Sequence, residues 1–274
     1  MKKRLYIHTK KMSSTPSAVY KIILIGDAGV GKTTCLAKFS EQYKKYENWQ
    51  ETKEEKKDEI NKIFFTKNTS PAKQQPTIGV EFESFDFSYP YISPFEKSPK
   101  KQGEKANLKI QIWDTAGQER YRAITKAHYR RANAAMLFFD TSDRKTFVNV
   151  KDVWWPEVRD AASDATGLSD SISLVQNKMD LEKKYKDNLH EGFCGNGDGG
   201  NKRTYPAIES FQEDNKFLHA KTSATTGEGV LDAFGKLINR IHEHHVENQK
   251  GNEDDNDAIK VSSDGGDQKG KGCC

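Results

Sequence analysis

The feature that most constrains the fold is a glycine-rich stretch between an apolar run and a helical pattern. Residues 22–25 are Ile-Ile-Leu-Ile, typical of a short buried strand, and residues 32–39 have the pattern of a helix. Between them, residues 26–33 read Gly-Asp-Ala-Gly-Val-Gly-Lys-Thr and satisfy the motif G-x-x-x-x-G-K-[ST]. This strand–loop–helix order predicts a phosphate-binding loop (P-loop) at the edge of a parallel sheet.

The residue types in this loop suit the phosphates of a nucleoside triphosphate. Backbone N–H groups of a glycine-rich loop can point at phosphate oxygens, and the helix N-terminus that follows favours negative charge. The Lys32 ammonium would contact the β- and γ-phosphates, and the Thr33 hydroxyl would bind Mg²⁺. We therefore expect the nucleotide to contact Gly26, Asp27, Ala28, Gly29, Val30, Gly31, Lys32, Thr33 and Thr34.

Apolar runs alternate with helical patterns along the rest of the chain. Strands are expected over 19–26, 80–87, 108–114, 134–140, 172–176 and 217–222, and helices over 32–39, 147–162 and 230–245. Such an alternation predicts an α/β, doubly wound P-loop domain with a six-stranded, mostly parallel sheet flanked by helices.

Residues 113–125 follow the third expected strand and read Trp-Asp-Thr-Ala-Gly-Gln-Glu-Arg-Tyr-Arg-Ala-Ile-Thr. A carboxylate at a strand end, here Asp114, can hold Mg²⁺ through water, Gly117 can offer its N–H to a terminal phosphate, and Gln118 can orient a water for attack. The stretch resembles the second switch of Ras-like small GTPases, in particular of the Rab family. This resemblance implies a GTPase switch, and it makes Gln118 the expected catalytic residue.

Two further segments resemble small-GTPase motifs around the magnesium ion and the base. Residues 77–82, Thr-Ile-Gly-Val-Glu-Phe, resemble the first switch of Rab proteins, so Thr77 would join Thr33 and Asp114 (through water) at Mg²⁺. Residues 222–225, Thr-Ser-Ala-Thr, resemble the last guanine motif. There Ser223 would lie beside Ala224, whose N–H would meet the base O6, and Thr225 replaces the Lys usual in the family, which should weaken base packing.

The base itself is expected to be selected by residues 177–180, Asn-Lys-Met-Asp, directly after the fifth expected strand. The Asp180 carboxylate can accept two hydrogen bonds from guanine N1 and N2, groups that adenine lacks in that arrangement. In this motif Lys178 would cover the ring, and Asn177 would tie the loop to the P-loop.

The spacing of the motifs departs from the family pattern. Thr33 and Thr77 are 44 positions apart, about twice the usual distance in small GTPases, so an insertion lies within the first switch. Insertions are expected near 44–70, 88–106 and 186–204, the first charge-dense, without a good apolar face, and the last Gly-rich and flexible. The aromatic ring that stacks on guanine has no fixed counterpart, and Tyr46, Phe64 and Phe65 are candidates.

The chain ends are expected to lie outside the G domain. Residues 1–18 are read as a flexible arm, 19–246 as the G domain and 247–274 as a flexible tail that is not polybasic. The terminal Cys273-Cys274 fits double geranylgeranylation, because two lipid chains give stable anchoring where one does not. We expect His242, His244 and His245, at the polar end of the last helix, to be solvated rather than to bind a metal.

Bulk properties exclude several other classes of protein. The formal net charge of +4 is too small to argue for nucleic acid, and no apolar run of membrane-spanning length or signal peptide is present. The four cysteines have neither metal-site nor disulfide-framework spacing, which favours a reducing compartment.

The Rab-like resemblance implies a switch that binds GTP or GDP with Mg²⁺, hydrolyses GTP slowly and regulates vesicle traffic. It would cycle between cytosol and the cytoplasmic face of intracellular membranes through two prenyl groups. Its implied partners are an exchange factor, a GTPase-activating protein, prenylation escort and extraction proteins, and effectors. Two alternatives stay open: a Rab-like scaffold that does not hydrolyse GTP, motivated by the inserted switch and Thr225, and an ATP-dependent kinase or ATPase, against which Asp180 argues.

Overall fold

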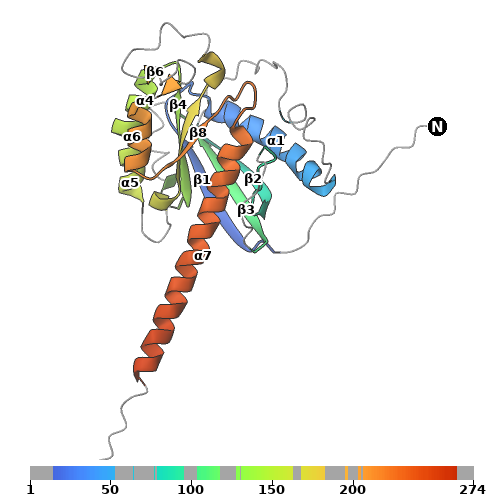
Figure 1. Ribbon diagram of the computed structural model, residues 1–274, viewed down its shortest axis with the longest axis vertical. Coiled ribbons are helices and arrows are strands. Elements are labelled where there is room, and N and C mark those ends of the chain that lie inside the picture. Colours follow the sequence, from blue (N-terminus) through green and yellow to red (C-terminus); the bar gives the residue numbers. More distant parts are fainter. Residues whose placement is uncertain are drawn as a thin grey trace, which may run out of the picture.

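The computed structural model describes residues 15–52, 64, 77, 79–95, 104–117, 128–129, 131–162, 168–182, 195–196, 203–204 and 206–263 (Figure 1). A six-stranded sheet has the order β2-β3-β1-β4-β5-β8, and only β2 runs antiparallel to its neighbour. Its strands are β1 Ala18–Ile25, β2 Val80–Tyr89, β3 Ala106–Thr115, β4 Ala134–Asp140, β5 Ile172–Asn177 and β8 Leu218–Lys221. The predicted doubly wound, mostly parallel α/β sheet is confirmed.

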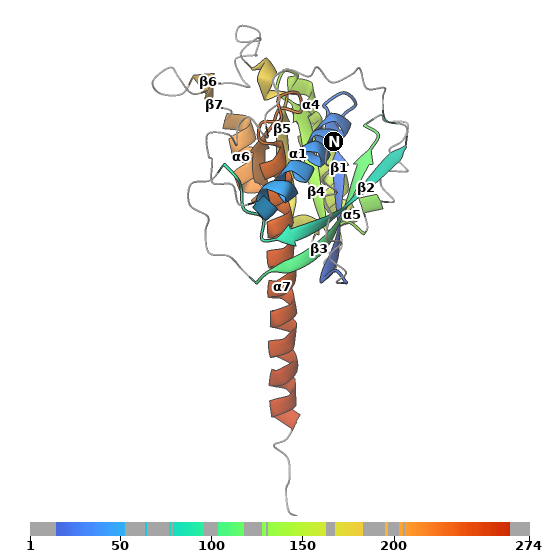
Figure 2. The same ribbon diagram turned by 90° about the vertical axis from the view of Figure 1, so that its right-hand side faces the viewer.

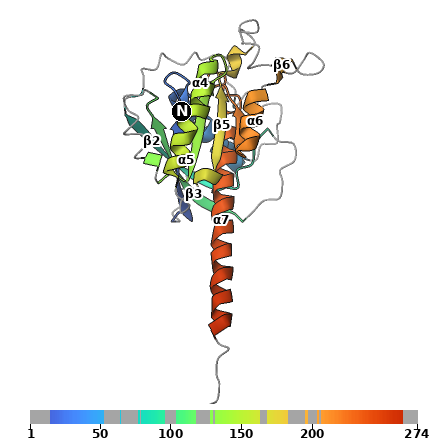
Figure 3. The same ribbon diagram turned by 90° about the vertical axis from the view of Figure 1, so that its left-hand side faces the viewer.

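Helices cover both faces of this sheet (Figures 1 and 3). One face carries α1 (Lys32–Thr52) and α7 (Val230–Ser263). The other carries α4 (Arg144–Asn149), the π-helix η2 (Val150–Trp154), α5 (Trp155–Ala161) and α6 (Pro206–Asp214). Short 3₁₀ turns, η4 (Leu168–Asp170) and η5 (Met179–Leu181), flank β5. Among the described helices, none has the length and apolar character needed to cross a membrane.

The alternation of side chains along the strands creates two separate apolar cores, because successive residues of a strand point to opposite faces. On β1, Ile22 and Leu24 pack towards α1 and α7, where Phe39 stacks on Phe234 with ring centroids 4.3 Å apart. Ile23 and Ile25 face the core beneath α4, η2, α5 and α6. Both cores are fully buried at β1, which lies in the middle of the sheet.

Helix α1 is longer than expected and includes the beginning of the first insertion. The charge-dense sequence beyond residue 44 was expected to lack an apolar face, but the helix continues to Thr52. Tyr43 and Tyr46 are buried on its inner side, and the Tyr46 ring lies 5.9 Å from that of Trp49 and 5.2 Å from that of Tyr91. Three aromatic residues at helical spacing therefore make the apolar stripe that the surrounding charges concealed.

The first two insertions meet in the core that α1 and α7 share. Tyr91, after β2, exchanges hydrogen bonds with the Asn239 side chain of α7: the amide N of Tyr91 donates at 2.8 Å, and its carbonyl accepts at 2.9 Å. Phe64 is 1% exposed and lies edge-on to Phe95, with centroids 5.7 Å apart. The second expected insertion, near 88–106, is thus a packed segment in its described part up to residue 95.

The close packing of Tyr91 requires a glycine in α7. A Cβ at Gly235 would lie 2.4 Å from ring atoms of Tyr91, closer than van der Waals contact permits. Tyr91 also donates its hydroxyl to Asp232 Oδ1 at 2.5 Å, one turn earlier on the same helix. The second insertion is therefore fitted to α7 through both shape and hydrogen bonds.

The later part of the chain has three structural features that were not expected. Residues 247–263 continue α7, where a flexible tail was expected, and Figure 2 shows this helix running well beyond the sheet. The stretch contains no proline, and extending an existing helix avoids the cost of nucleation. In the Gly-rich insertion, β6 (Gly195–Asn196) pairs antiparallel with β7 (Arg203–Thr204).

The third unexpected feature is the burial of His242. Its side chain is buried, 9% exposed, whereas it was expected to be solvated. Its Nδ1 lies 2.8 Å from the Tyr20 hydroxyl, and its ring packs edge-on to Tyr89 at 4.4 Å. Burial lowers the pKa of His242, so the neutral ring is the form that fits this site. The polar residues around His242 in the sequence gave no indication that its side chain lies on the inner face of α7.

Candidate functional site

The predicted site residues gather at one edge of the sheet. Strands β1, β3, β4, β5 and β8 are parallel, so their carboxyl ends lie on the same side. The P-loop follows β1, Asp114 lies near the end of β3 opposite Leu24, and Asn177 ends β5 opposite Asp140. In doubly wound sheets, ligands bind at this carboxyl edge.

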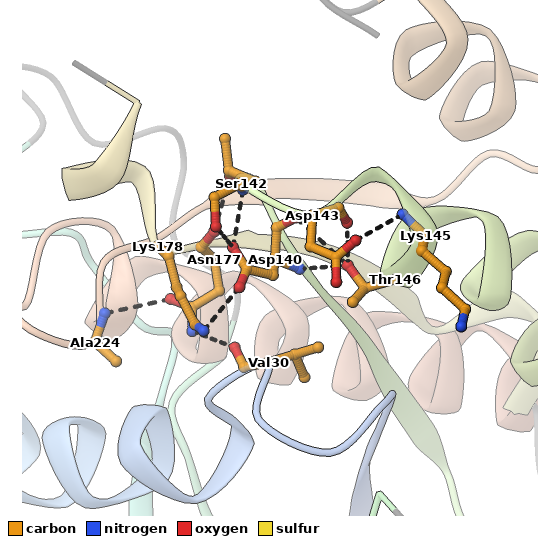
Figure 4. Close-up of polar contacts among 10 residues, drawn as sticks. Val30, Asp140, Ser142, Asp143, Lys145, Thr146, Asn177, Lys178 and Ala224 are labelled. Carbon is orange, nitrogen blue, oxygen red and sulfur yellow. Dashed lines mark hydrogen bonds and ion pairs between the residues drawn. The ribbon is translucent and has the colours of Figure 1, made fainter. Parts of the chain in front are cut away.

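The P-loop depends on glycines in backbone conformations that other residues avoid. Gly29 and Gly31 have φ values of 80° and 95°, in the left-handed region. A Cβ on Gly31 would lie 2.5 Å from the Asn177 amide nitrogen. Asn177 therefore approaches the loop closely, and its Nδ2 donates to the Val30 carbonyl at 2.8 Å (Figure 4).

Lys32 lies inside the P-loop with its ammonium against backbone carbonyls. Its Nζ donates to the carbonyls of Gly26 at 2.8 Å and Asp27 at 2.9 Å, and the side chain is 5% exposed. Burial lowers the Lys32 pKa to about 8, although the Asp114 and Asp27 carboxylates act in the opposite direction. An anionic phosphate would supply the negative charge that this buried ammonium lacks.

Asp27 directs its side chain away from the loop interior. The carboxylate accepts hydrogen bonds from Asn149 Nδ2 at 2.6 Å and from Trp154 Nε1 at 2.7 Å. Asn149 precedes and Trp154 ends the π-helix η2, whose i→i+5 bonding brings residues five apart onto one face. The role of Asp27 in the described structure is thus to anchor the P-loop to this helix, which the sequence alone did not indicate.

Three oxygen-bearing side chains converge next to Lys32. Thr33 Oγ1 lies 2.7 Å from Thr77 Oγ1 and donates to Asp114 Oδ2 in a short hydrogen bond. Asp114 is fully buried, and burial raises its pKa, opposed by the hydrogen bond from Thr33 and the charge of Lys32. Its Oδ1 is buried without a hydrogen-bond partner among the described residues.

This oxygen cluster fits a magnesium ion. Mg²⁺ binds oxygen ligands and retains several waters, and two hydroxyls with one carboxylate are a donor set of that kind. The unpaired Asp114 Oδ1 is the atom that a water on the metal would satisfy. The two threonines meet although 44 positions separate them, so the insertion between them does not prevent their approach.

Gly117 packs directly against the P-loop. A Cβ at this position would lie 2.4 Å from the Asp27 carbonyl carbon and 2.5 Å from the Ala28 nitrogen. The preceding residue, Ala116, donates its N–H to the Gly79 carbonyl at 2.9 Å and so joins the two switch segments. Gln118, the expected catalytic residue, lies outside the described residues.

The loop after β5 is held by the last guanine motif. Asp180 Oδ1 accepts from the Ser223 hydroxyl at 2.5 Å, and Asn177 Oδ1 accepts from the Thr222 hydroxyl at 3.1 Å. The Ala224 N–H, expected to meet the base, donates to Asn177 Oδ1 at 3.3 Å. Thr225 follows Ala224 in the same turn, residues 224–226.

The aromatic partner of the base is not among the candidates that the structure describes. Tyr46 and Phe64 are each 1% exposed and packed within the core of α1 and α7. A ring enclosed by other side chains has no free face for a purine, so both suggestions were wrong. Phe65 lies outside the described residues.

A carboxylate missed by the sequence analysis lies beside Lys178. The Asp140 carboxylate, at the end of β4, forms an ion pair with Lys178, whose Nζ lies 2.7 Å from Asp140 Oδ2 (Figure 4). The last residue of a buried strand is a place where a polar side chain can reach the carboxyl edge, which was the available signal in the sequence.

The fold and the site together define a P-loop nucleotide-binding protein of the small GTPase type. The family model of the Ras family matches residues 57–243. The chain is 31% identical to the Ras-related protein RABA1b of Arabidopsis thaliana over 93% of this chain and 94% of that protein. It is 32% identical to the Ras-related protein YPTC6 of Chlamydomonas reinhardtii, with the same coverage of each chain, 93% and 94%.

A third relative, the Ras-related protein RIC2 of Oryza sativa, is 31% identical over 82% of this chain and 75% of its own length. The chain belongs to the Ras family, and within the Ras superfamily it is a Rab-type small GTPase. The alignment with the first two relatives extends over nearly the whole chain, so the insertions lie within a Rab framework rather than between two domains.

Proposed function

We propose that the chain is a switch that binds GTP or GDP with Mg²⁺, hydrolyses GTP slowly and regulates vesicle traffic at intracellular membranes. The observation that carries this proposal is the convergence, at one sheet edge, of the P-loop, the Thr33–Thr77–Asp114 oxygens and the Asn177–Asp180 loop. Membership of the Ras family supports it.

In this proposal each part of the site binds one part of the nucleotide. The P-loop amides and Lys32 bind the phosphates, and Asp180 accepts two hydrogen bonds from guanine while Lys178 covers the ring. Asn177 keeps these two regions at a fixed separation, because it bonds both the Val30 carbonyl and the Thr222 hydroxyl.

Thr33, Thr77 and, through water, Asp114 would hold Mg²⁺. Bound there, the ion would contribute positive charge next to the β- and γ-phosphate oxygens. Thr77 reports the γ-phosphate in this scheme, because it belongs to the first switch and can leave Thr33 when the phosphate is lost.

Hydrolysis requires a water placed in line with the γ-phosphate, and we assign that role to Gln118. Gly117 would donate its N–H to the same phosphate, and it has no room for a side chain against the P-loop backbone. The Ala28 methyl would crowd an incoming catalytic group. Unaided turnover should be on the order of 10⁻⁴ s⁻¹ until a partner supplies an arginine.

Effectors would dock on an exposed aromatic surface next to the switches. Phe82 on β2 is 50% exposed, and its ring lies 5.3 Å from that of Trp113 on β3. Trp113 is flanked by the His128 ring at 4.8 Å and by Lys21 Nζ at 4.3 Å from the ring centroid. Because β2 begins three residues after Thr77, a change at the γ-phosphate would alter this surface.

Membrane attachment would use prenyl groups on Cys273 and Cys274, which lie outside the described residues. An escort protein would present the tail for prenylation, and an extraction protein would return the chain to the cytosol. An exchange factor and a GTPase-activating protein would set the nucleotide state.

The non-hydrolysing scaffold is disfavoured by the contact of Thr77 with Thr33, because its main motivation was an inserted switch that no longer closes. An ATP-dependent enzyme is disfavoured by the Asp180 carboxylate after β5. Single-turnover hydrolysis with and without an activating protein separates the switch from the scaffold: GTP that persists with the activator would contradict the switch.

The first test is the nucleotide released when freshly purified protein is denatured and the supernatant is chromatographed. We expect stoichiometric GDP or GTP from the wild type and little from D180A, which loses the guanine acceptor. Adenine nucleotide, or none, in the wild-type supernatant would overturn the proposal.

A further inference from the structure

A buried carboxylate at the end of β4 is joined to the loop that follows β5. Asp140 is 8% exposed, and its Oδ2 lies 2.7 Å from Lys178 Nζ (Figure 4). The two strands are parallel neighbours, and Asp140 lies opposite Asn177 in their register. The pair therefore connects two adjacent strand ends at the carboxyl edge of the sheet.

The Asp140 carboxylate is itself held in place from the opposite side. Its Oδ1 accepts from the Ser142 N–H at 2.8 Å and the Ser142 hydroxyl at 2.7 Å. Its backbone N–H donates to Thr146 Oγ1 of α4 at 2.9 Å. With donors on both oxygens and a bonded backbone, the carboxylate is a fixed point rather than a mobile surface charge.

Lys178 has unusual backbone geometry and a side chain that needs such a fixed point. Its φ of 64° and ψ of 36° lie in the left-handed region, which is uncommon for a residue with a Cβ. The Thr141 N–H and hydroxyl both donate to the Asn177 carbonyl, at 2.9 and 2.8 Å, and so hold the residue before it. These bonds fix the backbone, but the four-carbon stem of Lys178 keeps its rotational freedom unless its ammonium is bound.

We propose that Asp140 is a positioning residue for the guanine base. By holding the ammonium of Lys178, it keeps the apolar stem of that lysine across the purine ring and limits the departure of the nucleotide. The inference rests on the proposed function, in which Lys178 covers the base. It adds a residue from β4 to a guanine pocket otherwise built from the loops after β5 and β8.

The test is the rate at which full-length protein releases a fluorescent GDP analogue in Mg²⁺. The variant D140N keeps the shape of the side chain and an oxygen for the Ser142 donors, but it removes the charge that binds Lys178. We expect release about tenfold faster from D140N and from K178A. In the double variant D140N/K178A, we expect no further increase over K178A alone, because Asp140 acts through that lysine.

The matched control is D143N, which removes a carboxylate of the same turn. Asp143 is exposed and caps α4 by accepting from the Lys145 N–H at 3.0 Å, a role that asparagine also performs. Its release rate should equal that of the wild type. A D140N effect that persists in the K178A background would assign Asp140 a merely structural role and overturn the inference.

Two further outcomes are separable. If the wild type binds GDP but D140N releases the GDP analogue no faster than the wild type does, the positioning role alone is overturned. A wild type that does not bind GDP would overturn the proposed function together with this inference. Should D140N not fold, S142A replaces it: loss of the Ser142 hydroxyl loosens the carboxylate, release should be about twofold faster, and an unchanged rate would contradict the proposal.

Discussion

At the scale of single residues, the site is dominated by two buried charged groups, Lys32 and Asp114. Lys32 is enclosed by backbone carbonyls, and Asp114 has one carboxylate oxygen without a partner among the described residues. Each is costly without its counter-charge, since burial disfavours the ionised form of both groups. A nucleotide with Mg²⁺ would relieve both costs together, which couples phosphate and metal binding.

The pKa of Lys32, lowered to about 8 by burial, makes nucleotide binding dependent on pH. A bound phosphate favours the ammonium and raises this pKa, so affinity is full below about pH 8 and declines as the pH rises above it. At pH 8.5 binding of GDP·Mg²⁺ should take up more than about half a proton, and at pH 7.0 much less. Calorimetry in two buffers of different ionisation enthalpy measures the number of protons taken up on binding. No proton uptake at pH 8.5 would contradict the contact of Lys32 with the phosphates.

Asp27 and the π-helix give a second prediction for single residues. Trp154→Phe removes a donor to an ionised carboxylate, while Trp155→Phe removes only the bond from its ring N–H to Asn215 at 3.1 Å. Both changes delete the same atoms from buried rings, so packing losses are comparable. We expect W154F to lower the free energy of unfolding by about 1 kcal/mol more than W155F, because hydrogen bonds to charged groups are stronger. Urea denaturation of both variants measures this difference. Equal losses in the free energy of unfolding would contradict the role of Asp27 in anchoring the P-loop to the π-helix.

At the scale of elements, the first two insertions act as packing layers. The outer part of α1, Phe64 and the segment around Tyr91 bury aromatic rings against α7. Gln42, fully buried on α1, connects this layer to the guanine motif: its Nε2 donates to the Phe64 carbonyl at 3.1 Å and to the Gly227 carbonyl at 2.8 Å. These described residues of the first two insertions are thus part of the core.

Truncation of Phe64 tests whether the first insertion contributes to stability. Phe64→Ala should lower the free energy of unfolding by about 3 kcal/mol, the usual cost of deleting a buried phenyl ring. Phe82→Ala makes the same truncation on a half-exposed ring and should change stability by no more than about 1 kcal/mol. Denaturant unfolding at saturating GDP compares the two variants. A similarly small loss of unfolding free energy in both would mean that Phe64 does not stabilise the fold.

The elements also show what the sequence could reveal. All six strands of the main sheet were predicted, because buried parallel strands are short apolar runs and several end in recognisable motifs. The outer turns of α1 were missed because Tyr46 and Trp49 are separated by Glu47 and Asn48. The burial of His242 was missed because the residues that follow it are polar. Asp140, Asn149 and Trp154 could not be assigned roles, since their partners are distant in sequence and only the fold brings them together.

At the scale of the whole molecule, the site is assembled from the ends of five parallel strands and the loops that follow them. A ligand that bonds to several of these loops binds the folded chain and not the unfolded one. Its binding energy therefore stabilises the whole domain. The described part of α7 beyond the sheet makes no such connection and should not share in this effect.

GDP with Mg²⁺ at about a thousand times its dissociation constant should raise the free energy of unfolding by about 4 kcal/mol. ATP at the same concentration should have little effect, because adenine offers the Asp180 carboxylate no matching donors, and chelation of Mg²⁺ should remove part of the GDP effect. Thermal denaturation under the three conditions is the measurement. Equal stabilisation by ATP and GDP would contradict guanine selectivity.

The attachment of Phe64 bears on how readily the first switch can close. Loop-closure entropy depends on the number of residues between fixed points and rises by about 0.6 kcal/mol for each doubling. Counted from Thr52, where α1 ends, the chain must close over 77 − 52 = 25 positions to bring Thr77 to its place. Counted from Phe64, which Gln42 and Phe95 hold, it closes over 77 − 64 = 13 positions. The loop is nearly halved, so the packing of one phenylalanine lowers the entropic cost of closing the first switch by about 0.6 kcal/mol.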